Sequence, residues 1–520
     1  MKRFFNILSL SFGGLLFLVI LALGIILFQL SRGPINLDFL KSSAIEKVLI
    51  KSDSLDFETL QLSWDSLKSP LRLEGLNIHY VQGHHKTREV FLKKVQCYFS
   101  LKKLLKLKIV PEKIVVEGAR IIIHSFAGEV SEDHYKADLN FKRINAFLKT
   151  LLDLKSVLVS QSTLEIKSQK TPIIFDLSAH IAQLPGKIQG KVLAKNQGGQ
   201  GEITTDISYQ ESVGDVGVSV TLSGFDSDTF DDIVPEVFLQ DLTFTDLSST
   251  LSYHYSLKTG HHVAYLKGTI LEVDVTQSAY WNAPLTFPKL VFEGELKENK
   301  FTIKEIKSSV QDIPMSISAT GTIDEINDQV HLETHVIVHR IPFQDLVKVW
   351  PKGAADGARD WITENITRGL SPKSHLVMKS HFDFSAKKTF FTLDSLSGTI
   401  EVQNAVLGYV ATMPKVNKLM ALAHFDEEHF DIKIKSGETH GLKISSGSLF
   451  IGKFSDKTPH LDLALNIAGD LGDVLSLIDH KPLEYAKDYG LNPRTSTGVT
   501  QAKLKMSFPL SSPFETGQIK

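Results

Sequence analysis

Histidine and carboxylate side chains supply the most concentrated chemistry in the sequence. The best cluster combines one glutamate and three histidines at alternate positions: His331, Glu333, His335 and His339. The apolar residues Leu332 and Val336 alternate with them and indicate a strand. Residues four apart on a strand share a face but stand about 13 Å from one another, too far to ligate one ion. We therefore expect no metal site here.

The remaining candidates for chemistry have simpler explanations. The run from His424 to His429 mixes histidines with carboxylates, but its spacing matches no established site and a polar hairpin turn explains it. The pairs His84-His85 and His261-His262 stand beside predicted turns and are interpreted as solvated loop residues. The sequence has no Walker loop, no dinucleotide-binding glycine pattern and no nucleophile elbow. We expect no catalytic residue, no cofactor and no enzymatic activity, although a glycosidase could use two carboxylates far apart in sequence.

Composition narrows the class of protein further. The chain has 520 residues, 57 Lys plus Arg against 59 Asp plus Glu, and 42% apolar residues. The balanced charge gives no reason to expect nucleic-acid binding, and the apolar content supports a large folded core. Cys97 is the single cysteine, so the chain has no internal disulfide and no cysteine-based metal site. Its apolar surroundings favour a small core residue over a reactive thiol.

The N-terminus predicts a membrane anchor. No charged residue occurs from Phe4 to Ser31, and about 20 apolar residues suffice to cross the hydrocarbon core. A secretory signal peptide is the alternative, but its apolar region is shorter and ends at a cleavage site that is not seen here. Lys2 and Arg3 favour a cytoplasmic N-terminus, whereas Arg32 beyond the span weakens that bias.

Beyond Pro34 the chain predicts strand after strand with short turns. Apolar and polar residues alternate through 290–296, 315–323, 332–338, 442–451 and 461–465. A period of two with one apolar face is typical of half-buried antiparallel strands. The tripeptide Gly-Thr-Ile begins at Gly268, Gly321 and Gly398, at uneven spacing that excludes a strict repeat.

Helices are predicted at only a few places. Residues 142–154 and 343–350 show helical spacing, and Pro351 ends the second of these. Another short helix is predicted from Ala358 to Ile366 with Gly369 as its C-terminal cap, and one more from Leu483 to Tyr489. The loop Gln197–Gly201 is the best candidate for a domain boundary, or else a hairpin loop.

These patterns predict a mainly β chain with an N-terminal transmembrane helix. The predicted segments are a cytoplasmic N-terminus (1–3), the transmembrane helix (4–31), a β-rich segment (34–195), a second β segment (196–342), a helical segment (343–370) and a further β segment (371–520). The open edge of that last segment needs a cover, a partner or a missing remainder.

Three regions together resemble the AsmA-like proteins of Gram-negative envelopes and, within them, the YhdP branch. The first comprises the anchor with Gly33–Leu40 and the stretches 62–64, 73–78, 101–107 and 115–121. The second and most specific contains Trp350-Pro351, Ala358-Arg359-Asp360-Trp361-Ile362 and Gly369. The third contains Gly408-Tyr409, Met413-Pro414, 441–444, Pro482-Leu483 and Gly490-Leu491. Members of this branch are longer, so we expect an N-terminal half or a shortened relative.

The resemblance implies a long, twisted antiparallel β-sheet curled into an open trough with an apolar lining. It further implies an inner-membrane anchor, a periplasmic body, phospholipid as the ligand that moves between the membranes, and an outer-membrane or periplasmic protein partner. Such a trough needs one-sided strands whose apolar face acyl chains cover in place of a second protein layer.

Two readings of these faces stay open: a lipid conduit, and a tethered structural or assembly factor that conducts no lipid. The candidate groove residues lie on predicted apolar faces, where ordinary core packing is the alternative: Phe292, Leu296, Ile317, Ile323, Val336 and Val338. Trp350, Pro351, Arg359, Trp361 and Gly369 are predicted to fix the helical segment against the sheet. Arg359, if buried, needs a carboxylate or carbonyl partner.

Overall fold

The computed structural model of the chain describes residues 28–40, 54–66, 68–82, 88–104, 106, 109–124, 154–167, 172–231, 242–276, 284–310, 312–324, 327–350, 356–383, 390–409, 412–452, 460–481 and 483–509. It divides into two compact units. Unit 1 comprises Met1–Gln240 with Asp246–Ala264, and unit 2 comprises Asp241–Thr245 with Tyr265–Lys520.

The described residues form 25 β-strands and a few short helices, so the prediction of a mainly β chain is confirmed. The predicted transmembrane helix lies almost wholly outside these residues; only its end, in the helical stretch 28–32, is described. Within the described part of the chain, no helix combines the length and apolar character needed to cross a membrane. The predicted helix at 142–154 also falls outside it, apart from residue 154.

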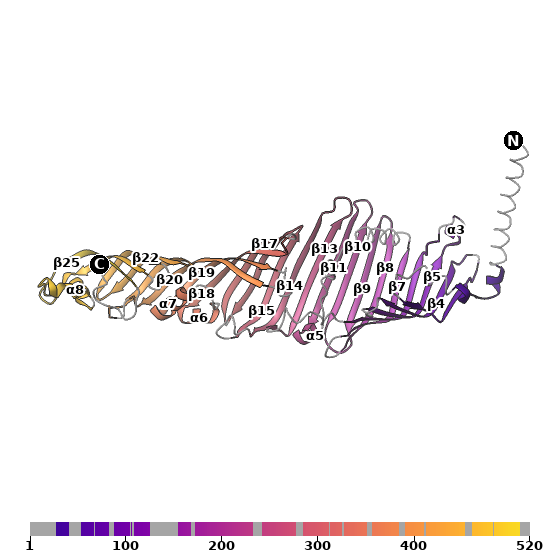
Figure 1. The fold of residues 1–520 in the computed structure, drawn as a ribbon, viewed down its shortest axis with the longest axis horizontal. Coiled ribbons are helices and arrows are strands. Elements are labelled where there is room, and N and C mark those ends of the chain that lie inside the picture. Colours follow the sequence, from indigo (N-terminus) through magenta and orange to yellow (C-terminus); the bar gives the residue numbers. More distant parts are fainter. Residues whose placement is uncertain are drawn as a thin grey trace, which may run out of the picture. The chain divides into compact units, whose positions relative to one another are not determined.

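Unit 1 is a sheet whose strands follow one another in chain order (Figure 1). The first two strands are short and depart from this order: β1 pairs with β3, and β2 pairs with β4. From β4 to β11 each strand pairs with the next, and β11 then pairs with β13. β6 and β7 run parallel, whereas their neighbours run antiparallel. The elements are β1 (Ile35–Asn36), η1 (Asp38–Leu40), β2 (Ser54–Asp56), β3 (Thr59–Ser63), β4 (Leu71–Gln82), β5 (Arg88–Phe99), α3 (Leu101–Leu104), β6 (Lys113–His124), β7 (Ser156–Lys167), β8 (Ile173–Leu184), β9 (Lys187–Asn196), β10 (Glu202–Gln210), β11 (Asp215–Phe225), α5 (Ser227–Asp231) and β13 (Asp246–Ser256).

In unit 2, each strand from β15 to β25 pairs antiparallel with the next strand along the chain. Figure 1 shows α6 and α7 beside β18, β19 and β20. The elements are β12 (Leu242–Thr243), β14 (His262–Val275, which begins in unit 1), β15 (Leu285–Lys297), β16 (Lys300–Val310), β17 (Ile313–Asp324), β18 (Gln329–Pro342), η3 (Phe343–Asp345), α6 (Leu346–Val349), α7 (Asp356–Asn365), β19 (Ile366–Asp383), β20 (Phe390–Leu407), β21 (Val416–Asp426), β22 (His429–Thr439), β23 (Leu442–Gly452), β24 (His460–Asp470), α8 (Leu471–Asp479), α9 (Tyr485–Asp488) and β25 (Val499–Pro509).

The predicted strands at 290–296, 315–323, 332–338, 442–451 and 461–465 are confirmed as β15, β17, β18, β23 and β24. The run from His424 to His429 contains the predicted polar hairpin turn, with Glu427 and Glu428 between the end of β21 and the start of β22. The Oδ1 atom of Asp426 accepts hydrogen bonds at 2.9 Å from the backbone N–H groups of Glu428 and His429. The loop Gln197–Gly201 is a hairpin loop between β9 and β10, with the Asn196 N–H donating to the Gly201 carbonyl.

The helix predicted to end at Gly369 is shorter than expected. α7 ends at Asn365, and Ile366 already begins β19. Gly369 is not a helix cap but lies inside this strand at φ +121°, where a Cβ atom would come within 2.6 Å of the Ala405 Cα. The prediction was wrong because Ile366 is an apolar residue at helical spacing from Ile362, yet it is buried as the first residue of the strand. At the C-terminal end, α9 spans Tyr485–Asp488 within the predicted range, whereas α8 was not predicted.

Two of the three Gly-Thr-Ile glycines lie opposite an aromatic residue of a neighbouring strand. Phe301 lies opposite Gly321, and Phe425 lies opposite Gly398. A Cβ atom at Gly398 would stand 2.6 Å from the Phe425 ring and 2.7 Å from the His375 carbonyl oxygen. Because glycine has no Cβ atom, the Phe425 ring can lie directly over the backbone at Gly398.

We expect Gly398→Ala to destabilise unit 2 by about 1–3 kcal/mol, because the added methyl group overpacks the site. The urea midpoint, followed by tryptophan fluorescence, measures this change, since the Trp350 and Phe425 ring centroids are 5.5 Å apart. Gly408→Ala is the matched control: its Cβ meets only atoms at 3.9 Å. Equal midpoints for the two variants would contradict the assigned role of Gly398.

Candidate functional site

Register aligns apolar side chains into a continuous row across unit 1. Successive Cα partners run from β1 through β3–β11 to β13, and directly opposed residues present their side chains on the same face. We call this set the unit 1 apolar row: Ile35, Leu62, Leu73, Cys97, Ile114, Val157, Ile181, Gly190, Ile207, Val218 and Tyr253.

The side chains of the unit 1 apolar row are only half-buried. A parallel set runs beside it with Val95, Val116, Val159, Val192 and Val220 among its members. These valines are half-buried as well, and the row ends at Leu251, which is 44% exposed. Buried side chains of this face gather toward its ends in the described part of unit 1. Leu154, Ile188 and Tyr209 form one cluster, and Phe175, Ala194, Phe225 and Leu247 are buried toward the opposite ends of their strands. Most of the face is thus apolar yet accessible.

Cys97 belongs to this row, opposite Leu73 and Ile114. Burial raises the pKa of its thiol, as expected for a small apolar residue and not for a reactive nucleophile.

The other face of unit 1 is polar. Cross-strand hydroxyl pairs stabilise it at Ser219–Ser252, 2.9 Å, and Thr221–Thr250, 3.2 Å. The contrast between the two faces follows directly from the period-two pattern of the strands.

Unit 2 carries an equivalent row. We call it the unit 2 apolar row: Phe292, Ile306, Ile317, Val336, Leu376, Gly398, Phe425, Phe430, Ile451 and Leu461. Three predicted groove residues lie in it. The other three lie on the same face of β15–β18. Leu296 opposes Phe301, which in turn opposes Gly321. Ile323 opposes Val330, and Val338 opposes Met315.

Exposure changes along the unit 2 apolar row. Phe292, Ile317 and Val336 are half-buried, as are Leu296 and Ile323 beside them, whereas Val338 belongs to the core. From β21 onward the row is closed: Phe430, Ile451 and Leu461 are fully buried. This end of the face is therefore packed protein and is not accessible.

The helical segment covers part of the closed face. Phe343, Leu346, Trp350 and Ile362 are buried in one core cluster with Phe425. Trp361 packs against that cluster while half-buried. The Arg359 side chain, 14% exposed, is paired with Asp360: its Nε and Nη2 atoms donate to Oδ1 at 3.0 and 2.9 Å. Pro351 lies outside the described residues.

A line of irregular residues crosses the strands where the face closes. Arg340 in β18, Gly369 in β19, Asn404 in β20 and Lys418 in β21 all have positive φ, and the register shifts beside the last three. Such bulges bend a strand and increase its twist. Their alignment on successive strands favours a tighter curl, which brings the apolar side chains together.

The predicted histidine strand lies on the polar face of β18. The register adds partners that the sequence pattern did not reveal: His331 lies opposite His381, and His335 Nδ1 is 3.2 Å from His375 Nε2. Glu333 Oε1 is 3.1 Å from His335 Nε2. Burial and the neighbouring His335 and Lys373 lower the pKa of His375. Among the described residues, no group of three or more ligands could hold a metal ion.

Tyr409 is the most distinctive titratable group beside the closed face. Its side chain is buried in the unit 2 core, and its hydroxyl has no hydrogen-bond partner among the described residues. Burial raises its pKa to about 12. The ionised phenol is thus disfavoured in the folded state.

Tyr409→Phe removes this unsatisfied hydroxyl, so we expect equal or higher stability at pH 8, by about 1 kcal/mol. Because the folded pKa lies above the unfolded value of 10.0, wild-type stability falls as pH rises from 10 toward 12. The variant lacks this loss, so its advantage in urea midpoint should grow above pH 10. Parallel pH profiles for the two proteins would contradict the burial of this hydroxyl.

Comparison with known proteins gives one match. Residues 269–520 match the family model described as YhdP protein, and this range begins within β14 and continues through unit 2. No curated protein and no solved structure matches the chain.

Proposed function

We propose that this chain, whose residues 269–520 match the YhdP family model, carries phospholipid on its apolar face as an envelope protein anchored in the inner membrane. The observation that supports it is the unit 1 apolar row, in register on eleven strands and half-buried along most of its length. Acyl chains lying on this row would remove its side chains from water, as a second protein layer does in an ordinary core.

The energetics suit a carrier. Each methylene group that leaves water for an apolar surface contributes about 0.8 kcal/mol. Successive strands stand about 4.8 Å apart and present similar aliphatic side chains. A lipid that moves from one strand to the next therefore exchanges equivalent contacts, and movement along the face needs no catalytic group. We accordingly propose a non-enzymatic role in envelope lipid homeostasis, in which phospholipid moves between the inner and outer membranes.

A tethered structural or assembly factor is the second candidate. The closed end of the unit 2 apolar row favours it, because Phe430, Ile451 and Leu461 leave no room for an acyl chain beside them. On this reading the open part of the face would receive a protein partner of the envelope and no lipid.

Ile207→Asp tests the carrier function in unit 1. A carboxylate in the middle of the apolar row should lower the phospholipid that co-purifies with the full chain by at least half, measured by mass spectrometry, because acyl chains cannot solvate it. Ser208→Asp, at the adjacent exposed position on the polar face, is the matched control and should leave the lipid content unchanged. Equal lipid content in both variants, with circular dichroism confirming the fold, would reject the proposal.

Photo-crosslinking separates the two candidates along unit 2. A benzophenone amino acid at Ile317, which is half-buried, should crosslink phospholipid in cells, whereas the same residue at Tyr265, 42% exposed on β14, serves as the solvent-facing control. Val336→Asp, on the strand opposite Ile317, should abolish the lipid adduct. Protein adducts at Ile317 without any lipid adduct would favour the assembly factor.

A further inference from the structure

Register gathers four segments of unit 1 at one edge of the sheet. Ile35 opposes Leu62, Ser63 opposes Arg72, Leu71 opposes Phe99, and Tyr98 opposes Lys113, which opposes Ser156. Four segments therefore share this edge: the one that enters β1, the turn between β3 and β4, the connection after β5, and the start of β7. We call it the basic edge and define it by the described residues 28–34, 64–66, 68–70, 100–104, 106, 109–112 and 154–155.

Positive charge dominates the basic edge. Its acidic residues, Asp65 and Glu112, are already paired. The carboxylate of Glu112 is 2.9 Å from the Lys155 Nζ and 3.9 Å from the Lys103 Nζ, and Asp65 is 3.9 Å from Arg72. Against these two carboxylates stand six basic residues: Arg32, Lys68, Lys102, Lys103, Lys106 and Lys155. Lys102 and Lys106 are exposed.

Apolar side chains project from the same edge. Ile109 is 77% exposed and Phe28 is 59% exposed. Isolated exposed apolar residues are common, but here they stand among lysines, and Phe28 continues the charge-free sequence that begins at Phe4. Lysines with apolar residues between them are typical of surfaces that lie on a membrane.

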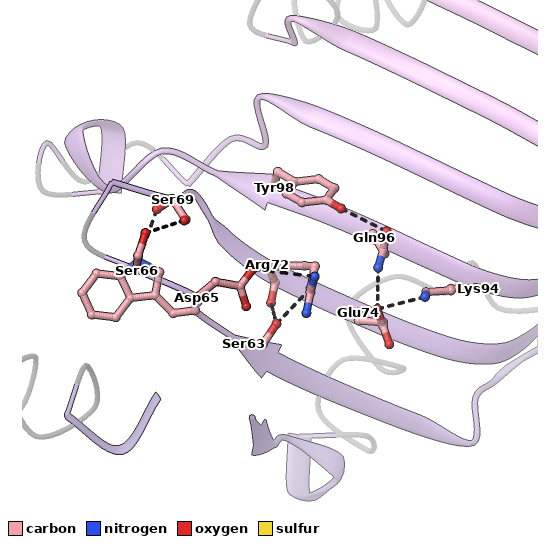
Figure 2. Close-up of polar contacts among 10 residues, drawn as sticks. Ser63, Asp65, Ser66, Ser69, Arg72, Glu74, Lys94, Gln96 and Tyr98 are labelled. Atoms are coloured by element: carbon pink, nitrogen blue, oxygen red, sulfur yellow. Dashed lines mark hydrogen bonds and ion pairs between the residues drawn. The ribbon is translucent and has the colours of Figure 1, made fainter. Parts of the chain in front are cut away.

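Hydrogen bonds join the described residues on the two sides of the turn between β3 and β4. The Trp64 indole N–H donates to the Ser69 carbonyl at 3.2 Å, and the Ser66 and Ser69 hydroxyls are 2.7 Å apart (Figure 2). The Arg72 Nε donates to the Ser63 Oγ at 3.0 Å and fixes the base of the turn. This part of the edge can therefore meet a flat surface without first paying an ordering cost.

We propose that the basic edge rests on a membrane surface rich in anionic phospholipid, with Ile109 inserted among the headgroups and Lys102 and Lys106 on their phosphates. This inference rests on the proposed function and names where lipid would be received. Leu62, Leu73 and Ile114 of the unit 1 apolar row lie two or three residues from the edge. Lipid at the basic edge would thus stand beside the first strands of the apolar face.

The test uses the full chain reconstituted in vesicles of phosphatidylcholine alone or with 30% phosphatidylglycerol, the fluorescent amino acid Anap replacing Ile109. In anionic vesicles the emission should shift to the blue and be quenched by lipids brominated near the headgroup, and 0.5 M salt should weaken both effects. The matched control carries Anap at Tyr489, which is 79% exposed in unit 2, and should report water in both vesicles.

Lys102→Glu/Lys106→Glu should lower the equilibrium constant for association of the basic edge with the anionic surface at least 25-fold, as obtained from the Anap emission at position 109, since each lysine near an anionic surface contributes about fivefold. Emission at position 109 that equals emission at position 489 in both vesicles would overturn the inference and point to a protein partner. Quenching of equal strength in neutral vesicles would overturn the assigned role of the lysines. Failure of this inference can be told apart from failure of the carrier function. Ile207→Asp tests lipid content without altering the charge of the basic edge, whereas the lysine variants test the edge alone.

Discussion

Cross-strand register is the constraint on which the rest of this structure depends. Side chains on a strand alternate between faces, so a slip of one residue would move every apolar side chain to the polar face. The pairings keep Ile114, Val157 and Ile181 directly opposite one another even where β6 and β7 change from antiparallel to parallel. A continuous apolar face follows from this alignment and not from any single motif.

The same pattern has two outcomes in this chain. In unit 1 the side chains of the apolar row are half-buried, whereas in the C-terminal half of unit 2 the face is filled by its own side chains and by Trp350 and Leu346 from the helical segment. The helical segment distinguishes the two cases, because Trp350 and Leu346 cover the face where burial becomes complete, whereas positive-φ residues occur in the strands of both units, at Gly118 and Gln161 as well as at Asn404. Both rows are apolar, so the helical cover is the feature that accompanies the loss of accessibility in unit 2.

The sequence predicted those features that depend on local periodicity. The strands around Phe292, Ile317 and Val336 and their shared face follow from alternation alone. It could not distinguish Val336, half-buried, from Phe430, fully buried, because both occupy apolar positions of alternating strands. It also overlooked the unit 1 apolar row, since Leu73, Cys97 and Ile114 become neighbours only through pairings between strands. Gly369 shows the same limit: a cap and a bulge both favour glycine.

Closure of the unit 2 apolar row has a consequence for any lipid on this chain. A lipid that follows the half-buried residues Ile306 and Ile317 meets the Phe425 ring beneath Trp350, at a ring-centroid distance of 5.5 Å. Separating these aromatic rings would expose side chains that are fully buried, such as Phe430 and Ile451, at about 1.5–3 kcal/mol for each one. Acyl chains that replaced the lost contacts would offset much of this cost. The helical segment, described at 343–350 and 356–365, is thus the part of unit 2 that lipid would have to displace.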